Sequence, residues 1–338
     1  MNALRAAERA GAADVERWRQ DPSLLATLPL GAFDEAPLTQ LVLRRLLLAL
    51  RVPPWLVYRL SRREGFRRAV ESSSYWRGVR GAVDDETWRR LTQGTTILMY
   101  HAFALGGERP SRFVVSRRAF ERQLRWLARR RPVLRLEDLL AHRRTHRLPP
   151  ARAVVVTIDD GYDDVRSEAH PALRALGIPA TLFVVTKRMG EANRWDPDGP
   201  LAGRPLVSWR DAGELHRDGL SLGAHTRTHP ALPELSPEEL EVEVAGSRED
   251  LAEALGEPVE TFAYPYGKWD EATAQAVARA GFGGAVSVRT GRNCAATPPY
   301  ALRRVEIHGD DSLARFVLAL AFGDSRILER IVRRFGGR

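Results

Sequence analysis

From Thr95 onward, short apolar runs alternate with amphipathic helical patterns, and this alternation constrains the fold more than any other feature. The run AVVVTID at 153–159 is almost continuously apolar, as expected of a strand buried on both faces. Residues 116–130 instead repeat apolar side chains at helical spacing. The alternation predicts an α/β protein with a parallel sheet covered by helices, open or closed into a barrel. About seven strands over roughly 215 residues favour the barrel.

The expected elements can be placed by residue number. Residues 236–255 begin with a capping box from Ser236 to Glu239, with Pro237 at the first helical position. The expected helices are 116–130, 163–176, 209–217, 236–255 and 271–280. The expected strands are 97–101, 153–159, 180–185, 220–224, 261–264, 284–288 and 302–307.

Polar side chains stand where these expected strands end. They are His101, Asp159, Asp160, His225, Tyr266 and His308. In parallel barrels the catalytic residues lie at the carboxyl ends of the strands. We therefore expect these six side chains to gather at one edge of the barrel.

The motif HTRTH at 225–229 supplies two histidines four residues apart. Such a pair can face one side of a helix or of a tight loop, and neutral imidazoles suit zinc and other late divalent ions. A carboxylate from elsewhere would complete three ligands and leave a position for water. We assign Asp160, His225 and His229 as ligands of a divalent metal, with Zn²⁺ favoured. Incidental surface histidines are the alternative, which the nearby Asp-Asp pair disfavours.

Asp159 precedes the expected ligand Asp160 at the strand end. Successive side chains of a strand point to opposite faces, so one carboxylate can bind metal while its neighbour turns toward the bound water. A metal lowers the pKa of that water, and Asp159 would accept its proton as general base. Helix capping is the alternative role of the pair, and Asp163 and Asp164 are better placed for it.

The motifs TIDDGYDD at 157–164, HTRTH, YPYG at 264–267 and EIH at 306–308 together resemble the NodB-type polysaccharide deacetylases, carbohydrate esterase family 4. ILMYHAF and FAYPYG are most similar to the branch containing exopolysaccharide poly-N-acetylglucosamine deacetylases. The resemblance covers about residues 95–312. It implies a distorted (β/α)7 barrel and metal-dependent hydrolysis of N-acetyl groups on sugars. It also implies the roles assigned above, with Asp159 as the base and Asp160 as a metal ligand.

The resemblance implies further site residues. The backbone N–H of Tyr266, between Pro265 and Gly267, would contact the oxyanion of the tetrahedral intermediate. His308 would protonate the leaving amine, with packing at a strand end as its alternative role. His101 would bind substrate or acetate, or would merely pack.

Two features depart from the family pattern. Many members have an arginine that orients the base where this chain has Ala263, and we expect Arg303 or Arg304 to substitute. The usual Asp-x-x-Asp-Trp motif is not evident near residues 283–297. Trp209 and Trp269 are candidate sugar-stacking platforms, although core packing is the favoured role of Trp209.

The sequence therefore predicts a carbohydrate deacetylase that removes N-acetyl or other small N-acyl groups from an amino-sugar polymer or a lipid-linked sugar. Two alternatives stay open. The same water attack would cleave the ester of an O-acetyl sugar. A carbohydrate-binding pseudoenzyme in a polysaccharide synthesis complex is favoured only by the missing arginine. The loop at 187–208 is long enough to form a lid or a substrate rim.

Residues 1–94 and 313–338 flank the expected catalytic domain at 95–312. The first is expected to be a helical extension with a helix ending near Arg51, before Pro53-Pro54, and the second a basic amphipathic helical tail. Packing on the barrel or on a partner is the plainer role of both. Residues 41–80 contain ten arginines and two acidic residues among many apolar ones, and the net charge is +9. This mixture favours an anionic membrane surface over nucleic acid, for which no binding signature is present.

The expected location is cytoplasmic, on or near the inner face of a membrane. The first thirty residues lack an apolar signal region, and the most apolar stretch, 38–60, is interrupted by arginines. Cys294 is the single cysteine and is expected to be an inert buried side chain. YWRGVR at 75–80 resembles the tail after some bacterial glycosyltransferase domains, which suggests a glycosyltransferase partner.

Overall fold

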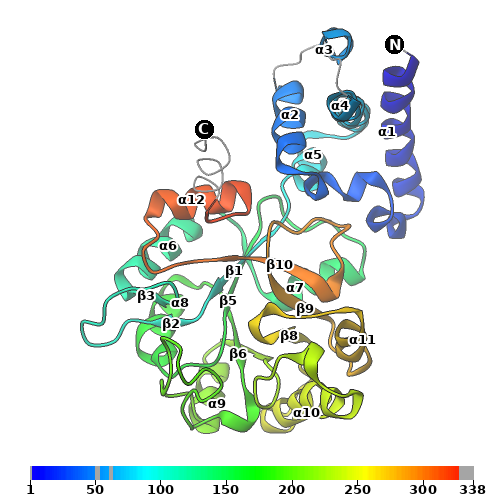
Figure 1. The fold of residues 1–338 in the computed structure, drawn as a ribbon. Coiled ribbons are helices and arrows are strands. Elements are labelled where there is room, and N and C mark those ends of the chain that lie inside the picture. Colours follow the sequence, from blue (N-terminus) through cyan, green and yellow to red (C-terminus); the bar gives the residue numbers. More distant parts are fainter. Residues whose placement is uncertain (1, 50–53, 61–63, 327–338) are drawn as a thin grey trace. The chain divides into compact units, whose positions relative to one another are not determined.

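The structure is a computed structural model that describes residues 2–49, 54–60 and 64–326. The chain divides into two compact units (Figure 1). The helical unit comprises residues 1–94, 142–152 and 293–297, and the barrel unit comprises residues 95–141, 153–292 and 298–338. No helix of the described residues is long and apolar enough to cross a bilayer.

Seven parallel strands of the described residues form a closed barrel, as the sequence predicts. Each strand pairs with the next along the chain, and β1 pairs with both β10 and β5, which closes the ring. In β1, Leu98 is in register with Val305 on one side and Val156 on the other. The strands are β1 (Thr96–Tyr100), β5 (Val154–Ile158), β6 (Thr181–Val184), β7 (Ser221–Ala224), β8 (Thr261–Ala263), β9 (Gly284–Thr290) and β10 (Leu302–Glu306).

Helices surround the barrel in Figure 1. The capping box at the start of α10 is present, with Ser236 and Glu239 each bonded to the other's backbone N–H. Gly256, in the left-handed region at φ 70°, ends the same helix. The helices are α6 (Arg117–Arg130), α7 (Leu136–Arg144), α8 (His170–Leu176), α9 (Trp209–Arg217), α10 (Pro237–Leu255), α11 (Glu271–Arg279) and α12 (Leu313–Phe322).

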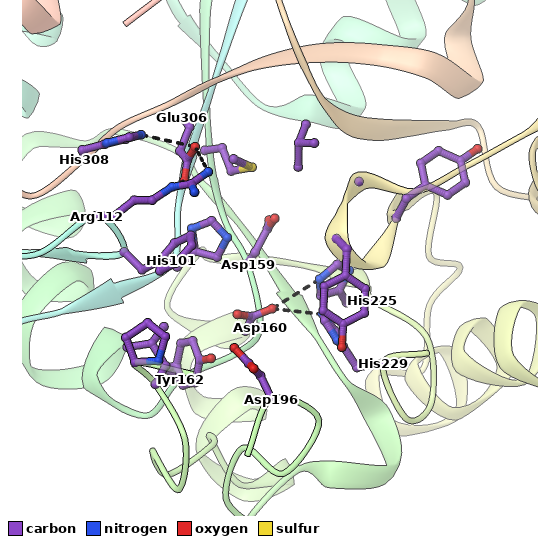
Figure 2. A pocket seen from close by; sticks show the side chains of 18 of the residues that line it. His101, Arg112, Asp159, Asp160, Tyr162, Asp196, His225, His229, Glu306 and His308 are labelled. Atoms are coloured by element: carbon purple, nitrogen blue, oxygen red, sulfur yellow. Dashed lines mark hydrogen bonds and ion pairs between the residues drawn. The ribbon is translucent and has the colours of Figure 1, made fainter. Parts of the chain in front are cut away.

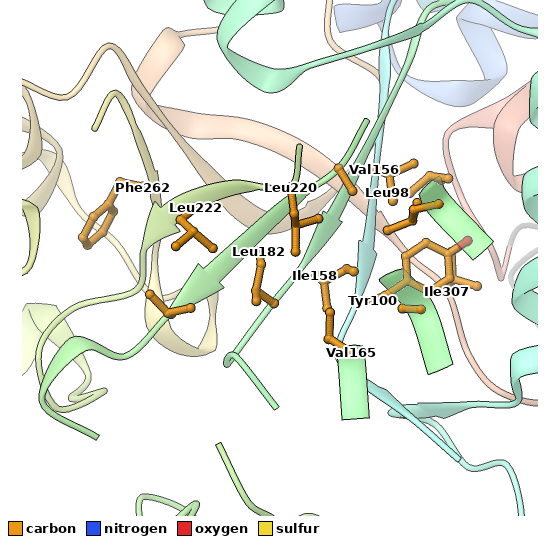
Figure 3. Close-up of a cluster of buried hydrophobic side chains, with 14 of the residues drawn as sticks. Leu98, Tyr100, Val156, Ile158, Val165, Leu182, Leu220, Leu222, Phe262 and Ile307 are labelled. Atoms are coloured by element: carbon orange, nitrogen blue, oxygen red, sulfur yellow. The ribbon is translucent and has the colours of Figure 1, made fainter. Parts of the chain in front are cut away.

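Strands β1 and β5 are buried along their whole length on both faces, which explains their continuous apolar sequences. Leu98 and Val156 belong to the large cluster between sheet and helices (Figure 3). Their neighbours Ile97 and Val155 belong to a second cluster, which also contains Phe183. Successive side chains therefore enter different layers of the core, and the barrel is a rigid support for the loops at its carboxyl edge.

The segment after β5 differs from the single helix expected over 163–176. Residues Val165–Ala169 form one π-helical turn, and α8 begins only at His170. The expected helix cap at Asp164 was wrong, because its side chain makes no capping bond. It instead accepts a hydrogen bond from the Phe103 N–H at 3.0 Å and pairs with Arg204 at 2.6 Å. Three short strands were also unpredicted, namely β2 (Ala102–Phe103), β3 (Val114–Val115) and β4 (Val133–Leu134).

The helical unit is built on the close crossing of α1 (Asn2–Gln20) and α4 (Glu64–Ala82). Glycine permits this approach: a Cβ on Gly11 would lie 2.1 Å from the Tyr75 carbonyl oxygen, and one on Gly78 would lie 1.8 Å from that of Glu8. The unit also contains α2 (Leu38–Ala49), α3 (Pro54–Leu60) and α5 (Asp85–Thr92). The sequence YWRGVR lies in α4, where Trp76 is buried and packs edge-on against Phe33. These side chains thus serve packing, and the glycosyltransferase partner stays a prediction.

Two segments distant in sequence complete the helical unit. Arg143 donates hydrogen bonds to the carbonyl oxygens of Cys294 at 3.1 Å and Ala295 at 3.3 Å, which joins residues 142–152 to 293–297. Cys294 itself is buried. Two expectations fall partly outside the described residues: the helix end near Arg51, since α2 is described to Ala49, and the tail, since residues 327–338 follow α12 and the Gly323 that caps it.

Candidate active site

A pocket of about 540 Å³ opens at the carboxyl edge of the barrel (Figure 2). It is lined by residues at the ends of β1, β5, β7, β8 and β10, together with part of the loop at 187–208. All six strand-end side chains named from the sequence line it: His101, Asp159, Asp160, His225, Tyr266 and His308. The parallel topology explains this, because every strand delivers its last residue to the same edge.

Asp160, His225 and His229 converge in the pocket. Asp160 Oδ1 lies 3.3 Å from His225 Nε2 and 3.4 Å from His229 Nε2, and the three candidate ligand atoms all lie within 4.8 Å of one another. Asp160 and His229 both have left-handed backbones, at φ 72° and 70°, as does Thr226 at 67°. Non-glycine residues rarely adopt this conformation, and such residues cluster at functional sites.

The ring nitrogens of the two histidines suit a metal. His225 Nδ1 lies 2.8 Å from the Ala263 carbonyl oxygen, which fixes the proton on Nδ1 and leaves the Nε2 lone pair facing Asp160. His229 Nδ1 is buried and has no hydrogen-bond partner among the described residues, while its Nε2 faces Asp160. Trp195 stacks on the His229 ring at a centroid distance of 4.6 Å. One carboxylate and two imidazoles form a donor set that fits a late divalent ion.

Charge and burial work against each other in this cluster. Burial raises the pKa of Asp160, but hydrogen bonds from His225 and His229 hold it well below its ordinary value. Burial lowers the pKa of His225, but the neighbouring Asp160 and Asp159 carboxylates raise it above its ordinary value. Burial dominates at His229, whose pKa is lowered. A bound cation would replace the shared protons and balance the two aspartates.

Asp159 and Arg304 form a buried bidentate ion pair. Arg304 donates to Asp159 Oδ1 at 2.6 Å and to Oδ2 at 2.7 Å, and the two side chains are 0% and 4% exposed. Burial raises the pKa of Asp159, but the Arg304 charge more than offsets this and the net pKa is lowered. Asp159 is therefore held ionised and in a fixed orientation. Of the two arginines named from the sequence, Arg303 instead lies against Gly291.

His308 and His101 have different surroundings. His308 Nε2 lies 3.2 Å from Glu306, and its Nδ1 faces Arg326, so both ring nitrogens are engaged at the pocket rim. Arg112 also donates two hydrogen bonds to the Glu306 carboxylate, at 2.9 and 3.0 Å. His101, in contrast, lies beside the two aspartates (Figure 2), and its charge lowers the pKa of both Asp159 and Asp160.

Tyr266 forms an exposed wall of the pocket. Its backbone is left-handed at φ 56°, and a Cβ on the following Gly267 would lie 2.2 Å from Val288. The Tyr266 ring is 47% exposed and packs edge-on against His229, and its hydroxyl donates to the Trp195 carbonyl oxygen at 3.3 Å. The turn formed by Pro265, Tyr266 and Gly267 therefore brings the Tyr266 ring against His229, one of the three candidate ligands.

Several pocket residues were not named individually from the sequence: Arg112, Tyr162, Asn193, Trp195, Asp196 and Glu306. Three of them, Asn193, Trp195 and Asp196, belong to the loop at 187–208 that was expected to form a lid or a substrate rim. Glu306 lies two residues before His308 on the same strand end, which is the one signal that could have identified it. The expectation of core packing for Trp209 was wrong, because its side chain is 37% exposed on α9. Trp269 is partly buried and stacks on Tyr264, and neither tryptophan is among the residues that line the pocket.

The barrel unit is similar to known polysaccharide deacetylases. Residues 146–285 match the family model for polysaccharide deacetylase. The protein YxkH of Bacillus subtilis (strain 168) is 26% identical over 212 residues, which cover 62% of this chain and 70% of YxkH. Poly-beta-1,6-N-acetyl-D-glucosamine N-deacetylase of Staphylococcus aureus (strain MSSA476) is 26% identical over 180 residues, or 50% of this chain. The chain spans only 59% of the length of that relative.

The solved structure of the Streptococcus pyogenes deacetylase PplD in complex with acetate has the same fold. It superimposes with a TM-score of 0.59 at 24% sequence identity and covers 67% of this chain and 98% of PplD. The barrel is thus similar to almost all of that protein, while about a third of this chain has no counterpart in it.

Proposed function

We propose that the chain, of which residues 146–285 match the polysaccharide deacetylase model, is a carbohydrate deacetylase that hydrolyses N-acetyl groups, or other small N-acyl groups, on an amino-sugar polymer or a lipid-linked amino sugar. The observation that carries this proposal is the convergence of Asp160, His225 and His229 beside the ion pair of Asp159 and Arg304. The named activity of the Staphylococcus aureus relative on an N-acetylglucosamine polymer supports the substrate class.

Asp160, His225 and His229 would hold a divalent metal, with Zn²⁺ the best match to one carboxylate and two imidazoles. When bound, such an ion would polarise the acyl carbonyl of the substrate and lower the pKa of a water molecule. The backbone N–H of Tyr266 would stabilise the negative charge that develops on the acyl oxygen. Trp195 and Tyr266, which pack on His229, restrict the position of that ring and keep water from it.

Asp159 accepts the proton of the attacking water. Its carboxylate is ionised and oriented because Arg304 donates to both of its oxygens in a buried position. The guanidinium thus replaces the arginine that many family members carry at the position of Ala263. Arg304 acts through Asp159 as a positioning residue, and it does not reach the substrate.

His101 is proposed as the group that protonates the leaving amine. It lies beside Asp159 and Asp160 in the pocket (Figure 2), on the side where the proposed base and metal ligands would meet the acyl group of the substrate. His308, which the family resemblance assigns to this step, has one nitrogen facing Glu306 and the other facing Arg326. Protonation of the amine by His308 would require it to leave both partners, so we assign it to the wall of the substrate pocket.

Acetate release tests the function. The metal-loaded protein should release acetate from N-acetylglucosamine oligomers and lose this activity after chelation, with recovery when Zn²⁺ is returned. A matched O-acetyl sugar separates amide from ester hydrolysis: preference for the ester would establish the esterase alternative. Stoichiometric metal binding without turnover on either substrate would favour the carbohydrate-binding pseudoenzyme.

The identity of the acid is tested by His101→Gln and His308→Gln side by side. We expect kcat to fall by about 100-fold or more in the first variant and by less than about tenfold in the second, because general acids typically contribute 10²- to 10⁴-fold. A substrate with a leaving group that needs no protonation should restore the rate of His101→Gln. The reverse order of the two losses would return the role to His308.

A further inference from the structure

We propose that the end of the helical unit formed by α2, α3 and the start of α4 binds an anionic lipid surface. This inference is independent of the proposed function. Of the twelve large hydrophobic side chains that are exposed among the described residues, five lie between positions 42 and 66. They are Val42 and Leu46 on α2, Trp55 and Leu56 on α3, and Phe66 on α4, each between 38% and 51% exposed. We call these five residues the apolar patch.

The three helices that carry the apolar patch are packed on one small core. Leu47 of α2 and Val70 of α4 are buried together with Leu4, and Val57 of α3 packs against them. The exposed residues immediately neighbour these buried ones along each helix: Leu46 precedes Leu47, and Leu56 precedes Val57. The patch residues are therefore carried by helices that share a formed core.

The segment of sequence that carries the apolar patch is strongly basic. Residues 38–70 contain eight arginines and one acidic residue, Glu64. Arg59 is exposed on α3, Arg67 lies over the Tyr58 ring at 4.4 Å, and Arg68 is exposed in a salt bridge with Glu64. Arg44 is buried, where it donates to the Phe33 carbonyl oxygen, so it helps to hold α2 in place and is not available to a partner.

Apolar and cationic side chains interleaved on short surface helices match the chemistry of an anionic membrane interface. Acyl chains would take up Leu, Val and Phe side chains, the headgroup region suits Trp, and anionic headgroups attract arginine. Nucleic acid would satisfy the arginines but offers nothing to Val42, Leu46 and Leu56. A second copy of the chain would bring like charges together. An anionic lipid surface would accommodate both the apolar patch and the exposed arginines of the same helices.

Vesicle sedimentation tests this inference with the full-length protein. We expect the protein to sediment with phosphatidylcholine vesicles containing about 30% phosphatidylglycerol, far less with phosphatidylcholine alone, and less again when salt rises from about 0.1 M to 0.5 M. The double variants Trp55→Ser with Leu56→Ser, and Arg59→Glu with Arg68→Glu, should each bind anionic vesicles at least tenfold more weakly. All four positions are exposed, so neither variant removes a core side chain.

Matched controls come from the barrel unit. Trp209→Ser removes another exposed tryptophan, and Arg129→Glu with Arg130→Glu reverses two exposed arginines on α6, so both controls should bind vesicles like the wild type. Equal vesicle binding by the patch variants and the wild type would overturn the proposal. Concentration-dependent dimerisation without lipid, abolished by Trp55→Ser with Leu56→Ser, would overturn it in favour of a second copy. We expect the patch variants to release acetate from a soluble oligosaccharide at the wild-type rate, which separates this inference from the proposed function.

Discussion

Arg304→Gln removes the positive half of the buried ion pair that orients the proposed base. Among the described residues, Arg304 heads the largest side chains that are fully buried, and it donates to Asp159 at 2.6 and 2.7 Å, to Ser287 O at 2.9 Å and to Thr157 Oγ1 at 3.2 Å. Glutamine is shorter and neutral, so Asp159 would keep its charge in a site without a counter-charge. The metal ligands are untouched by this change.

The geometry sets the expected magnitudes. Removing one partner of a buried ion pair destabilises a protein by about 3–5 kcal/mol, because the remaining charge is desolvated and unpaired. Loss of a residue that orients an active-site group costs about 10- to 100-fold in activity. Burial raises the pKa of Asp159 and Arg304 more than offsets this increase, so removal of Arg304 raises that pKa. The acidic limb of the kcat/KM profile should therefore move to higher pH.

The assay combines urea unfolding, metal content and acetate release as a function of pH. Arg303→Gln, on the same strand but outside the ion pair, is the matched control and should change all three readouts little. Arg304→Lys keeps the charge without the two-pronged contact and should recover part of the stability and rate. Wild-type stability and an unshifted pH profile in Arg304→Gln would refute the role of the ion pair.

Three further changes test the surroundings of the site. Asp160→Asn should lower metal stoichiometry, measured by elemental analysis, with little change in the barrel's circular dichroism; full metal occupancy would argue against this ligand set. In the wild type, Zn²⁺ affinity measured by competition titration should fall as pH decreases, because the pKa of His225 is raised and protons compete for its ring; a pH-independent affinity would contradict this. Burial raises the pKa of Glu306, but His308 and Arg112 lower it to about 2. Its stabilisation is thus complete above its ordinary value of 4.5 and is lost as pH falls toward 2, so Glu306→Gln should reduce the free energy of unfolding at pH 7 by at most about 3 kcal/mol and by much less near pH 3. An equal loss at both pH values would show that the ion pair does not contribute.

The barrel was predictable because its sequence signal is local. Strands β1 and β5 are almost uninterrupted apolar runs, and α10 has its cap encoded in Ser236 and Glu239. The closed barrel, which the structure confirms, was predicted from the number of such strands. The π-helical turn at 165–169 was not predictable, because it depends on Asp164 reaching the Phe103 N–H and Arg204, which lie far away in sequence.

The candidate site also contains contacts that the sequence predicts and contacts that it does not. Short motifs with fixed spacing placed Asp160, His225 and His229 in one cluster, since parallel strands share an edge. The sequence left Arg303 and Arg304 as equal choices, because the face of the strand that meets Asp159 depends on the register of β10 against β1. The contact of His308 with Arg326 depends on how the segment after α12 returns to the pocket, and no local pattern encodes that contact.

Single-turnover acetate release by the Zn²⁺-loaded wild type and by Asp159→Asn, with metal content measured in the same samples, tests the central claim most directly. We expect one metal ion bound in both proteins, acetate released by the wild type, and a rate at least about 100-fold lower in the variant, because the proposed base is lost while the ligands remain. Equal rates at equal metal content would contradict the assignment of Asp159 as the base. Absence of bound metal in the wild type would contradict the site as a whole.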